Sequence, residues 1–402
     1  MTQQDILRLA ISHHNAGRTV EAERLYREVL RQWPGHPVAA TLLARLALRA
    51  GQFLEARSLL ETAIAGAPDY AQGHATLAEC LESVGEAAEA ERSHRRALVL
   101  SPGQAASLIS LGNAAQQADD NHCASLLYRR ALTIQPGSIP AANNLASASL
   151  KRADPMAAMT ATDRVLRRDP GHVRATAYRT VALRALGRGE EADALIGLGS
   201  LVQPLQLDVG REYRDIAAFN TALIEALETH PNLSKDWDPT QRAIRGGAIV
   251  PRLMAHDAPV LLAFERHLRT AIDKAIFALP DDPTHPFLSR KPRAYDLDVW
   301  ANFLGRSDHQ SAHIHNLGWM SGVYYVAVPE LEPDEDPRAG WIEFNRPGYG
   351  IPDLGGEAGI EAIQPRPGMA IVFPSYVWHG TIPFRGAGQR ISIAFDLHPK
   401  TA

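Results

Sequence analysis

The chain has 402 residues, of which 45% are hydrophobic and 21% are charged, a composition typical of a folded globular protein. This length exceeds one ordinary hydrophobic core and predicts two or more domains. A formal net charge of -4 gives no electrostatic reason to expect nucleic acid or an anionic membrane as a partner. The start lacks a signal-peptide pattern, and no apolar run approaches the roughly 20 residues of a membrane span. Because Cys80 and Cys123 also form no CxxC motif, we expect a cytoplasmic protein without a membrane or nucleic-acid partner.

The first half of the chain repeats every 34 residues. Proline keeps this period at Pro34, Pro68, Pro102, Pro136 and Pro170. Alanine keeps it at Ala22, Ala56, Ala90, Ala124, Ala158 and Ala192. Five residues before these alanines stand Gly17, Gly51, Gly85, Asp119, Ala153 and Gly187. The shared phase predicts one helical hairpin per unit, with small residues where two helices meet and a proline where the second helix ends.

This array resembles the tetratricopeptide repeat, whose unit length and whose small-residue, turn and proline positions it matches. The resemblance implies an all-α superhelix over residues 1–205, in about six units. Arrays of this kind hold an extended peptide or a protein in a concave groove, so we expect a protein or peptide partner there. The repeat phase places polar residues toward that groove: Gln72, Glu79, Glu82, Asn113, Gln116 and Asn143. The alternative is that these residues form a solvated polar face.

After about residue 200 the 34-residue phase is lost, and residues 215–227 and 259–277 are predicted to form amphipathic helices. From about Ala294 the pattern changes to short β-runs separated by glycine and proline. The predicted strands are YDLDVWANFL, AHIHN, SGVYYVAV, GWIEF, IEAIQP, MAIVFP, WHGTIPF and RISIAFD. Short strands in this number favour a barrel or jelly roll. Residues 206–402 are therefore interpreted as a double-stranded β-helix (jelly roll) domain with flanking helices at its start.

Three histidines in this region, His313, His315 and His379, have the pattern of metal ligands. Residues two apart on a strand point to the same face, so His313 and His315 can reach one metal ion, which His379 can join from a later turn. Neutral imidazoles suit iron, zinc, copper or nickel, so ligand type alone does not choose the metal. Arg390 opens the last predicted strand, and Ser392 shares its face. A guanidinium fork near a metal predicts that a substrate or cosubstrate carboxylate binds beside it.

The segments HIHNLGWMSGVYYV, PGMAIVFPSYVWHG and RISIAFD resemble the 2-oxoglutarate/Fe(II) oxygenases, and most of all a bacterial branch with an HxH motif followed by SGVYY. The resemblance implies that two histidines and a carboxylate hold iron, and that an Arg-x-Ser pair binds the 5-carboxylate of 2-oxoglutarate. The histidine roles fall on His313 and His379. The Arg-x-Ser roles fall on Arg390 and Ser392, and Tyr325 matches a position that adds a hydroxyl group to the same carboxylate.

One residue departs from the family pattern, because His315 stands where the carboxylate ligand is expected. Its place on the predicted strand favours His315 as the third iron ligand, which makes His313, His315, His379 and Arg390 the predicted catalytic set. The alternative is a site with two histidines and a carboxylate from elsewhere, either Asp308 or Glu343.

The resemblance implies a dioxygenase that uses Fe(II), 2-oxoglutarate and O2, releases succinate and hydroxylates its substrate. The attached array favours a protein or peptide substrate over a free metabolite. Two other classes stay open. One is a repeat scaffold whose jelly roll has lost activity, as the missing carboxylate suggests. The other is a cupin-like metalloenzyme that does not use 2-oxoglutarate, against which the Arg-x-Ser pair counts.

Overall fold

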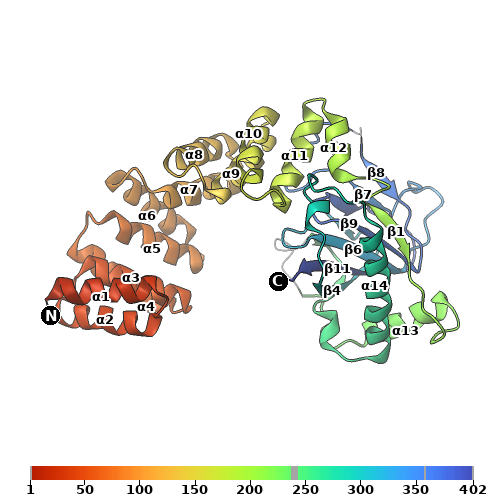
Figure 1. Ribbon diagram of the computed structural model, residues 1–402, viewed down its shortest axis with the longest axis horizontal. Coiled ribbons are helices and arrows are strands. Elements are labelled where there is room, and N and C mark those ends of the chain that lie inside the picture. The colour runs from red at the N-terminus through yellow and green to blue at the C-terminus, as the bar shows by residue number, and fades with distance from the viewer. Residues whose placement is uncertain (1, 237–242, 357–358, 401–402) are drawn as a thin grey trace. The chain divides into compact units, whose positions relative to one another are not determined.

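The computed structural model describes residues 2–236, 243–356 and 359–400. Its contacts divide the chain into two compact units, Met1–Ala148 and Ser149–Ala402 (Figure 1). The first unit is helical, and the second joins the last repeat helices to all the strands that the described residues form. The sequence-based boundary after residue 205 marks where the repeat phase ends, and it stays a prediction about the domains.

Helices of the first unit pack in successive pairs, α1 with α2, α3 with α4, α5 with α6 and α7 with α8. Their bounds are α1 (Gln3–Asn15), α2 (Thr19–Gln32), α3 (Pro37–Arg49), α4 (Phe53–Gly66), α5 (Ala71–Ser83), α6 (Ala87–Leu100), α7 (Ala105–Gln117), α8 (Asn121–Ile134) and α9 (Ile139–Lys151), of which α9 ends in the second unit. The all-α array predicted for the first half is confirmed.

The repeat phase has the predicted structural cause. Each of the six periodic alanines is at most 2% exposed, so a larger side chain there would separate two packed helices. The turn residues five positions earlier all have a positive φ. Asp119 (φ 60°) and Ala153 (φ 54°) adopt the same left-handed conformation as the glycines that fill the other turn slots. The backbone of the hairpin therefore fixes this turn even where glycine is absent.

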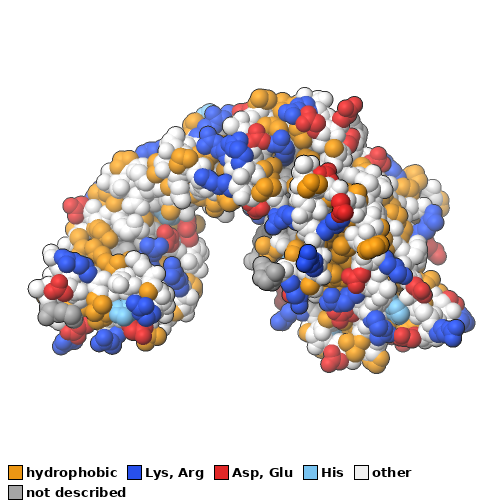
Figure 2. All heavy atoms as spheres, viewed as in Figure 1, with side chains coloured by type: hydrophobic (Ala, Val, Ile, Leu, Met, Phe, Trp, Pro, Cys, Tyr) orange, Lys and Arg blue, Asp and Glu red, His pale blue; other side chains and the backbone are white. Residues whose placement is uncertain are grey.

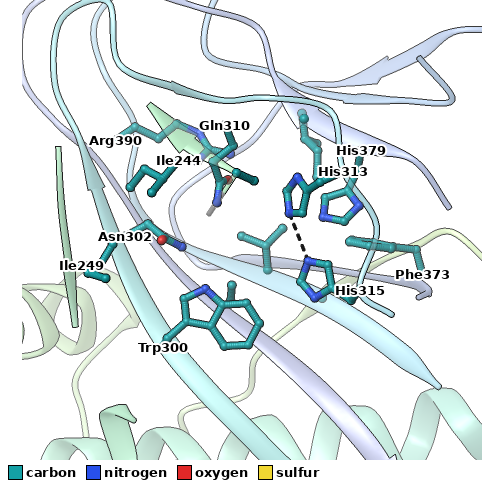
Figure 3. A pocket seen from close by; sticks show the side chains of 16 residues that line it. Ile244, Ile249, Trp300, Asn302, Gln310, His313, His315, Phe373, His379 and Arg390 are labelled. Carbon is teal, nitrogen blue, oxygen red and sulfur yellow. Dashed lines mark hydrogen bonds between the residues drawn. The ribbon is translucent and has the colours of Figure 1, made fainter. Parts of the chain in front are cut away.

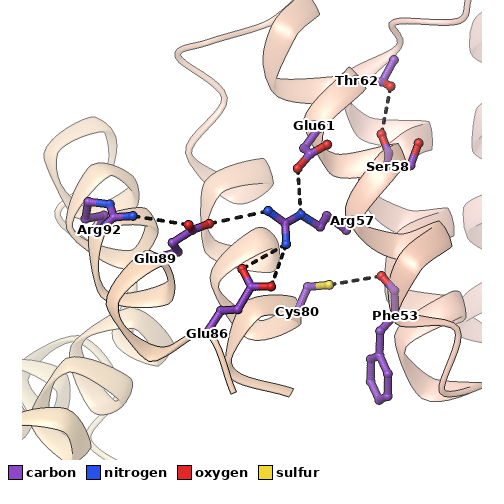
Figure 4. A network of polar contacts seen from close by, with 9 residues as sticks. All are labelled: Phe53, Arg57, Ser58, Glu61, Thr62, Cys80, Glu86, Glu89 and Arg92. Carbon is purple, nitrogen blue, oxygen red and sulfur yellow. Dashed lines mark hydrogen bonds and ion pairs between the residues drawn. The ribbon is translucent and has the colours of Figure 1, made fainter. Parts of the chain in front are cut away.

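Ion pairs connect neighbouring hairpins on the solvent side of the first unit (Figure 4). Arg57 on α4 contacts Glu61 on its own helix at 2.9 Å and Glu86, the residue before α6, also at 2.9 Å. Its guanidinium also reaches Glu89 on α6 at 3.6 Å. Because these side chains are a third or more exposed, each pair contributes roughly 0–1 kcal/mol, and the buried alanine contacts dominate the stability of the stack.

The second unit begins with repeat helices and continues into a helix-flanked β region. Its helices are α10 (Pro155–Leu166), α11 (Val173–Ala185), α12 (Gly189–Ile196), α13 (Ile216–Glu228) and α14 (Pro259–Ala278), with the 3-10 turns η1 (Leu253–Ala255) and η2 (Leu288–Arg290). The predicted helices over 215–227 and 259–277 are confirmed as α13 and α14.

The strands form one large and two small antiparallel sheets. The large sheet has the order β1-β9-β6-β11-β4-β3, and the small sheets have the orders β10-β7-β8 and β2-β5. Strand bounds are β1 (Gln203–Gln206), β2 (Ile244–Arg245), β3 (Ala248–Val250), β4 (Tyr295–Leu304), β5 (His309–Gln310), β6 (Met320–Ala327), β7 (Ile342–Phe344), β8 (Glu361–Ile363), β9 (Met369–Pro374), β10 (His379–Thr381) and β11 (Arg390–Pro399). The β-rich second half is confirmed, while the jelly-roll arrangement stays a prediction.

The predicted AHIHN strand is wrong. This segment forms only an isolated bridge between His313 and His379. The backbone N–H of His313 donates to the carbonyl of His379 at 2.9 Å, but two residues later the N–H of His315 donates to Ser375 at 3.1 Å. Because the segment changes its partner within two residues, no ladder can form along it.

Alternation along β11 gives the large sheet two different faces. Ile391, Ile393, Phe395 and Leu397 are buried on one face. That face lies under α13 and α14, where Phe264 packs on Tyr324 with ring centroids 5.3 Å apart and Asn220 accepts a hydrogen bond from the Tyr324 hydroxyl at 2.6 Å. The opposite face presents Arg390, Ser392, Ala394 and Asp396. This face of β11 is therefore the one that carries the candidate chemistry.

The surface shows both signs of charge. Acidic and basic side chains are scattered over the visible face of each unit in Figure 2. Among the residues that the structure describes, no helix is both long enough and apolar enough to span a membrane.

Candidate active site

Three imidazole rings lie close together beside the face of the large sheet that carries Arg390 and Asp396. His313, His315 and His379 each offer a ring nitrogen, and these atoms lie within 4.8 Å of one another. The Nε2 atoms of His313 and His315 are 3.2 Å apart (Figure 3). His379 begins β10, and its backbone exchanges hydrogen bonds with His313 in both directions. The structure thus brings together the three residues that the sequence predicts as metal ligands.

Hydrogen bonds fix the orientation of each ring. Nδ1–H of His313 donates to the carbonyl of Ser311 at 2.8 Å, and Nδ1–H of His379 donates to that of Val377 at 3.0 Å. A carbonyl oxygen can only accept, so the proton of each neutral ring lies on Nδ1 and the Nε2 lone pair is free. Nδ1 of His315 lies 2.6 Å from the Asp396 carboxylate, which selects the same tautomer. The Nε2 atoms of His313 and His315 lie 3.2 Å apart, close enough for both to bind one ion.

Burial keeps two of these rings neutral. It lowers the pKa of His313 to about 3, with the neighbouring His315 as the second cause. Burial also lowers the pKa of His379 well below its ordinary value, and His313 adds to that effect. Neutral imidazole is the form that binds a metal ion, so His313 and His379 do not have to lose protons before they bind one near neutral pH.

Asp396, which the sequence reasoning did not identify, lies directly behind His315. Its Oδ1 accepts from His315 Nδ1–H at 2.6 Å and from the Ser321 hydroxyl, also at 2.6 Å. Ser321 in turn contacts Ser375 at 2.7 Å. A carboxylate behind a ligating histidine fixes the tautomer and increases the basicity of the ring. His315 replaces the carboxylate that the family pattern predicts at this position, and Asp396 supplies a negative charge on the far side of its ring.

Changing Asp396 to Asn is expected to weaken the affinity for a divalent metal such as Fe(II) by about tenfold, the lower end of the 10–100-fold range for such partners. The amide oxygen can still accept from His315, but the charge is lost. Asp298→Asn is a matched control, because Asp298 is exposed and is the cross-strand neighbour of Asp396. Anaerobic metal titration measures both affinities, and equal values for the Asp396 variant and the parent would remove Asp396 from this role.

Arg390 lies in the same cavity, with a side chain that is only 1% exposed. Its guanidinium donates to the carbonyl of Gly340 at 3.2 Å, to the Ser392 hydroxyl at 3.4 Å and to the Tyr325 hydroxyl at 3.3 Å. No carboxylate among the residues that the structure describes pairs with it. Burial lowers the pKa of Arg390 from its ordinary value, but an arginine side chain stays charged. A buried charge without a counter-ion is costly, so this position favours a bound anion.

The two hydroxyl groups beside Arg390 complete a set of donors. Ser392 and Tyr325 are cross-strand neighbours on β11 and β6. Each oxygen accepts from the guanidinium, which leaves each O–H proton available for another acceptor. Burial raises the pKa of the Tyr325 phenol, so the hydroxyl keeps its proton. Together, the guanidinium and the two hydroxyl groups suit a carboxylate.

Asn302 is a second residue that the sequence reasoning missed. It lies beside Ser392 on β4, is 2% exposed, and lines the cavity. Its Nδ2 has no hydrogen-bond partner among the described groups. Figure 3 shows the amide pointing into the cavity that also holds Arg390 and the imidazoles. An unpaired buried donor of this kind predicts a polar acceptor on a bound molecule.

The cavity that joins these groups has a volume of about 190 Å³. Its polar wall contains the three histidines, Asn302 and Arg390, and its apolar wall contains Ile244, Ile249, Trp300, Val323, Ile342 and Phe373. Trp300 packs beside His315 with ring centroids 5.6 Å apart. The histidine cluster and the guanidinium of Arg390, which has no carboxylate partner among the described residues, therefore line one partly apolar chamber.

Neither alternative carboxylate joins the histidine cluster. Asp308 accepts from the backbone N–H of Gly305 at 2.8 Å and so holds a turn. Glu343 pairs with Arg346 at 2.7 Å. It also lies on the strand face opposite Phe344, the cross-strand neighbour of His379. The geometry favours His315 as the third ligand.

Comparisons with known families agree with both halves of the sequence interpretation. Residues 298–396 match the family model described as "Putative 2OG-Fe(II) oxygenase". Residues 14–80 and 47–96 match the model described as "Tetratricopeptide repeat". The three histidines and the polar residues Asn302, Tyr325, Arg390, Ser392 and Asp396 all lie within the first match, whereas the cavity-lining Ile244 and Ile249 precede it. No curated protein matches the chain.

Among solved structures, the chain is similar to pilF of Pseudomonas aeruginosa, with 16% identity, coverage of 48% of this chain and 87% of that chain, and a TM-score of 0.44. A tetratricopeptide repeat protein from Parabacteroides merdae is 18% identical over 48% of this chain and 76% of that chain, with a TM-score of 0.37. TTC0263, a TPR protein of Thermus thermophilus, is 21% identical over 45% and 99%, with a TM-score of 0.37.

Proposed function

We propose that this chain is a 2-oxoglutarate-dependent Fe(II) dioxygenase. Residues 14–96 match the tetratricopeptide repeat model, and residues 298–396 match the model of a 2OG-Fe(II) oxygenase domain. The observation that carries the proposal is the buried, unpaired guanidinium of Arg390 in the same cavity as the three-histidine cluster. A metal-binding barrel of another class has no need for that cation. A dicarboxylate cosubstrate needs both a metal and a distant anion site.

The residues fit Fe(II). Imidazole is a good iron ligand, and three neutral rings on one side of an ion leave its other positions open for exogenous ligands. In this proposal His313, His315 and His379 hold the ion through Nε2, as their Nδ1 contacts allow. The set carries one negative charge fewer than two histidines and a carboxylate. Asp396 offsets part of that difference through His315.

The residues also fit 2-oxoglutarate. Arg390, Ser392 and Tyr325 would bind the 5-carboxylate, and the keto acid end would face the metal. The unpaired Nδ2–H of Asn302 would donate to an oxygen of the bound cosubstrate. The apolar wall of the chamber limits the access of water to these contacts and strengthens each of them.

Fe(II) bound there would supply the chemistry in which 2-oxoglutarate, O2 and a C–H bond yield succinate, CO2 and the C–OH product. The chain's contribution is to hold the acid and the metal at fixed positions and to keep the site dry. We propose a protein or peptide as the hydroxylated substrate, because repeat arrays generally bind such partners and this array is part of the same chain.

Anaerobic addition of 2-oxoglutarate to Fe(II)-loaded protein tests the proposal. The keto acid is expected to produce a visible metal-to-ligand charge-transfer band that saturates at one equivalent per chain. Glutarate has the same two carboxylates but no keto group, so it is expected to compete without producing the band. If the protein bound a full equivalent of Fe(II) but produced no band, the 2-oxoglutarate assignment would be wrong, and a metal-binding domain of other chemistry would remain.

The role of His315 gives a separate prediction. His315→Ala removes one ligand and is expected to weaken Fe(II) affinity by at least tenfold. His315→Asp restores the usual carboxylate but places it beside Asp396, so repulsion is expected to limit the recovery. The double change His315→Asp with Asp396→Asn removes that repulsion and is expected to restore most of the affinity. Metal titration of the three variants measures this order, and an alanine variant with parental affinity would exclude His315 as a ligand.

A further inference from the structure

The last repeat hairpin, formed by α11 and α12, contacts the turn that directly precedes His379, one of the proposed metal ligands. This turn connects β9 to β10 and contains Tyr376, Val377 and Trp378. Nε1–H of Trp378 donates to the carbonyl of Ala177 on α11 at 3.1 Å. The Tyr376 hydroxyl donates to the carbonyl of Leu195 on α12 at 2.6 Å. Both contacts lie within the compact unit Ser149–Ala402.

These contacts hold the residues on either side of Val377, whose carbonyl orients the His379 ring. Trp378 is 1% exposed, and its ring centroid lies 6.3 Å from that of Tyr178 on α11 and 5.1 Å from that of Tyr349. The acceptor of the indole N–H is therefore a carbonyl of α11 and not a group of the β region. Movement of α11 would therefore move the backbone next to the metal ligand.

The HxH segment is tied to the same hairpin. Arg174 on α11 donates to the side chain of Asn316, the residue after His315, at 3.2 Å. The Tyr349 hydroxyl contacts the backbone N–H of Ile314, between the two histidines, at 3.3 Å, and the Tyr349 ring packs on Trp378. The chain then leaves α12 and enters β1, which pairs with β9 at the edge of the large sheet. Both segments that supply the imidazoles are thus attached to α11–α12.

We propose that the α11–α12 hairpin, which the repeat period assigns to the array, is a positioning element of the metal centre. It holds the Tyr376–Trp378 turn and so sets the position of His379 against the HxH segment. The proposal rests on the metal site of the proposed function but not on 2-oxoglutarate, because the metal alone reports the geometry of the three imidazoles.

The test replaces single hydrogen bonds in the full-length chain. Trp378→Phe keeps an aromatic ring but removes the donor to Ala177, and Tyr376→Phe removes the donor to Leu195. Trp319→Phe is the matched control. Trp319 is also buried and also donates to a backbone carbonyl, that of Phe287, the residue before η2, which belongs neither to α11 nor to α12. Loss of a buried donor and of indole volume thus occurs in both tryptophan variants.

Co(II) serves as the probe, because its visible spectrum reports ligand geometry and its titration gives the affinity. Trp378→Phe is expected to weaken Co(II) binding about tenfold and to shift the visible bands, as changes behind a ligand do. Tyr376→Phe is expected to weaken it about threefold, and Trp319→Phe by less than about twofold. Thermal unfolding checks that all three variants are folded, and if Trp378→Phe is not, Tyr376→Phe decides.

The proposal would be overturned if the folded Trp378→Phe and Tyr376→Phe variants bound Co(II) with the affinity and the visible bands of the parent. An equal loss in Trp319→Phe would also overturn it, because general destabilisation would then explain the effect. A parent that binds Co(II) but not 2-oxoglutarate would refute the proposed function alone and leave this comparison intact.

Discussion

Arg390→Met is expected to abolish tight binding of 2-oxoglutarate while leaving metal binding unchanged. Methionine removes both the charge and the fork that the guanidinium directs toward a carboxylate. Truncating one partner of a buried charge pair costs roughly 2–5 kcal/mol. That cost corresponds to a loss of affinity of about thirtyfold to several thousandfold. Arg390→Lys keeps the charge and is expected to lose less.

The charge-transfer band under nitrogen measures both cosubstrate affinities. Arg385→Met is a suitable control, because Arg385 precedes the same strand but is half exposed and pairs with Asp334 on the surface. It is expected to bind 2-oxoglutarate like the parent. Undiminished cosubstrate binding in Arg390→Met would contradict the assignment of the anion site.

His379→Ala is expected to reduce Fe(II) affinity by at least a hundredfold. It removes one of the three proposed ligands and also a buried ring that packs against His313 with centroids 4.3 Å apart. His309→Ala is the control, because His309 lies just before the HxH segment. Within the described chain its side chain has one hydrogen bond, to the carbonyl of Ser307. Metal content after dialysis, compared with the parent, measures both effects. Full iron content in the His379 variant would place the metal elsewhere.

The sequence predicts the array and the three histidines because each depends on a local period. An alanine every 34 residues marks a close helix contact, and two histidines two apart share a face wherever the backbone is extended. His313 and His315 therefore converge although the predicted AHIHN strand does not form. Alternation alone also places Arg390 and Ser392 on one face of β11.

The remaining site residues depend on tertiary pairing. Asp396 continues the alternation of Arg390 and Ser392, but its function depends on His315, 81 residues away in sequence. Asn302 becomes recognisable only through the register that places it beside Ser392. The bond from Trp378 to Ala177 spans 201 residues and crosses the boundary predicted after residue 205. A repeat period has no signal for such a contact, because it describes how units resemble one another and not what the last unit touches.

The most direct test of the central claim is the conversion of 2-oxoglutarate by the purified, Fe(II)-loaded chain in the absence of a substrate. We expect succinate and CO2 to accumulate when iron, 2-oxoglutarate, O2 and ascorbate are all present, because ascorbate supplies the two electrons that reduce the second oxygen atom when no C–H bond is offered. Proton NMR follows both acids, and one succinate is expected for each 2-oxoglutarate consumed. His379→Ala and Arg390→Met are expected to form none above background. If iron-loaded parent protein that binds 2-oxoglutarate formed no succinate over many hours in air, the oxygenase account would be contradicted and a repeat scaffold with an inactive metal domain would take its place.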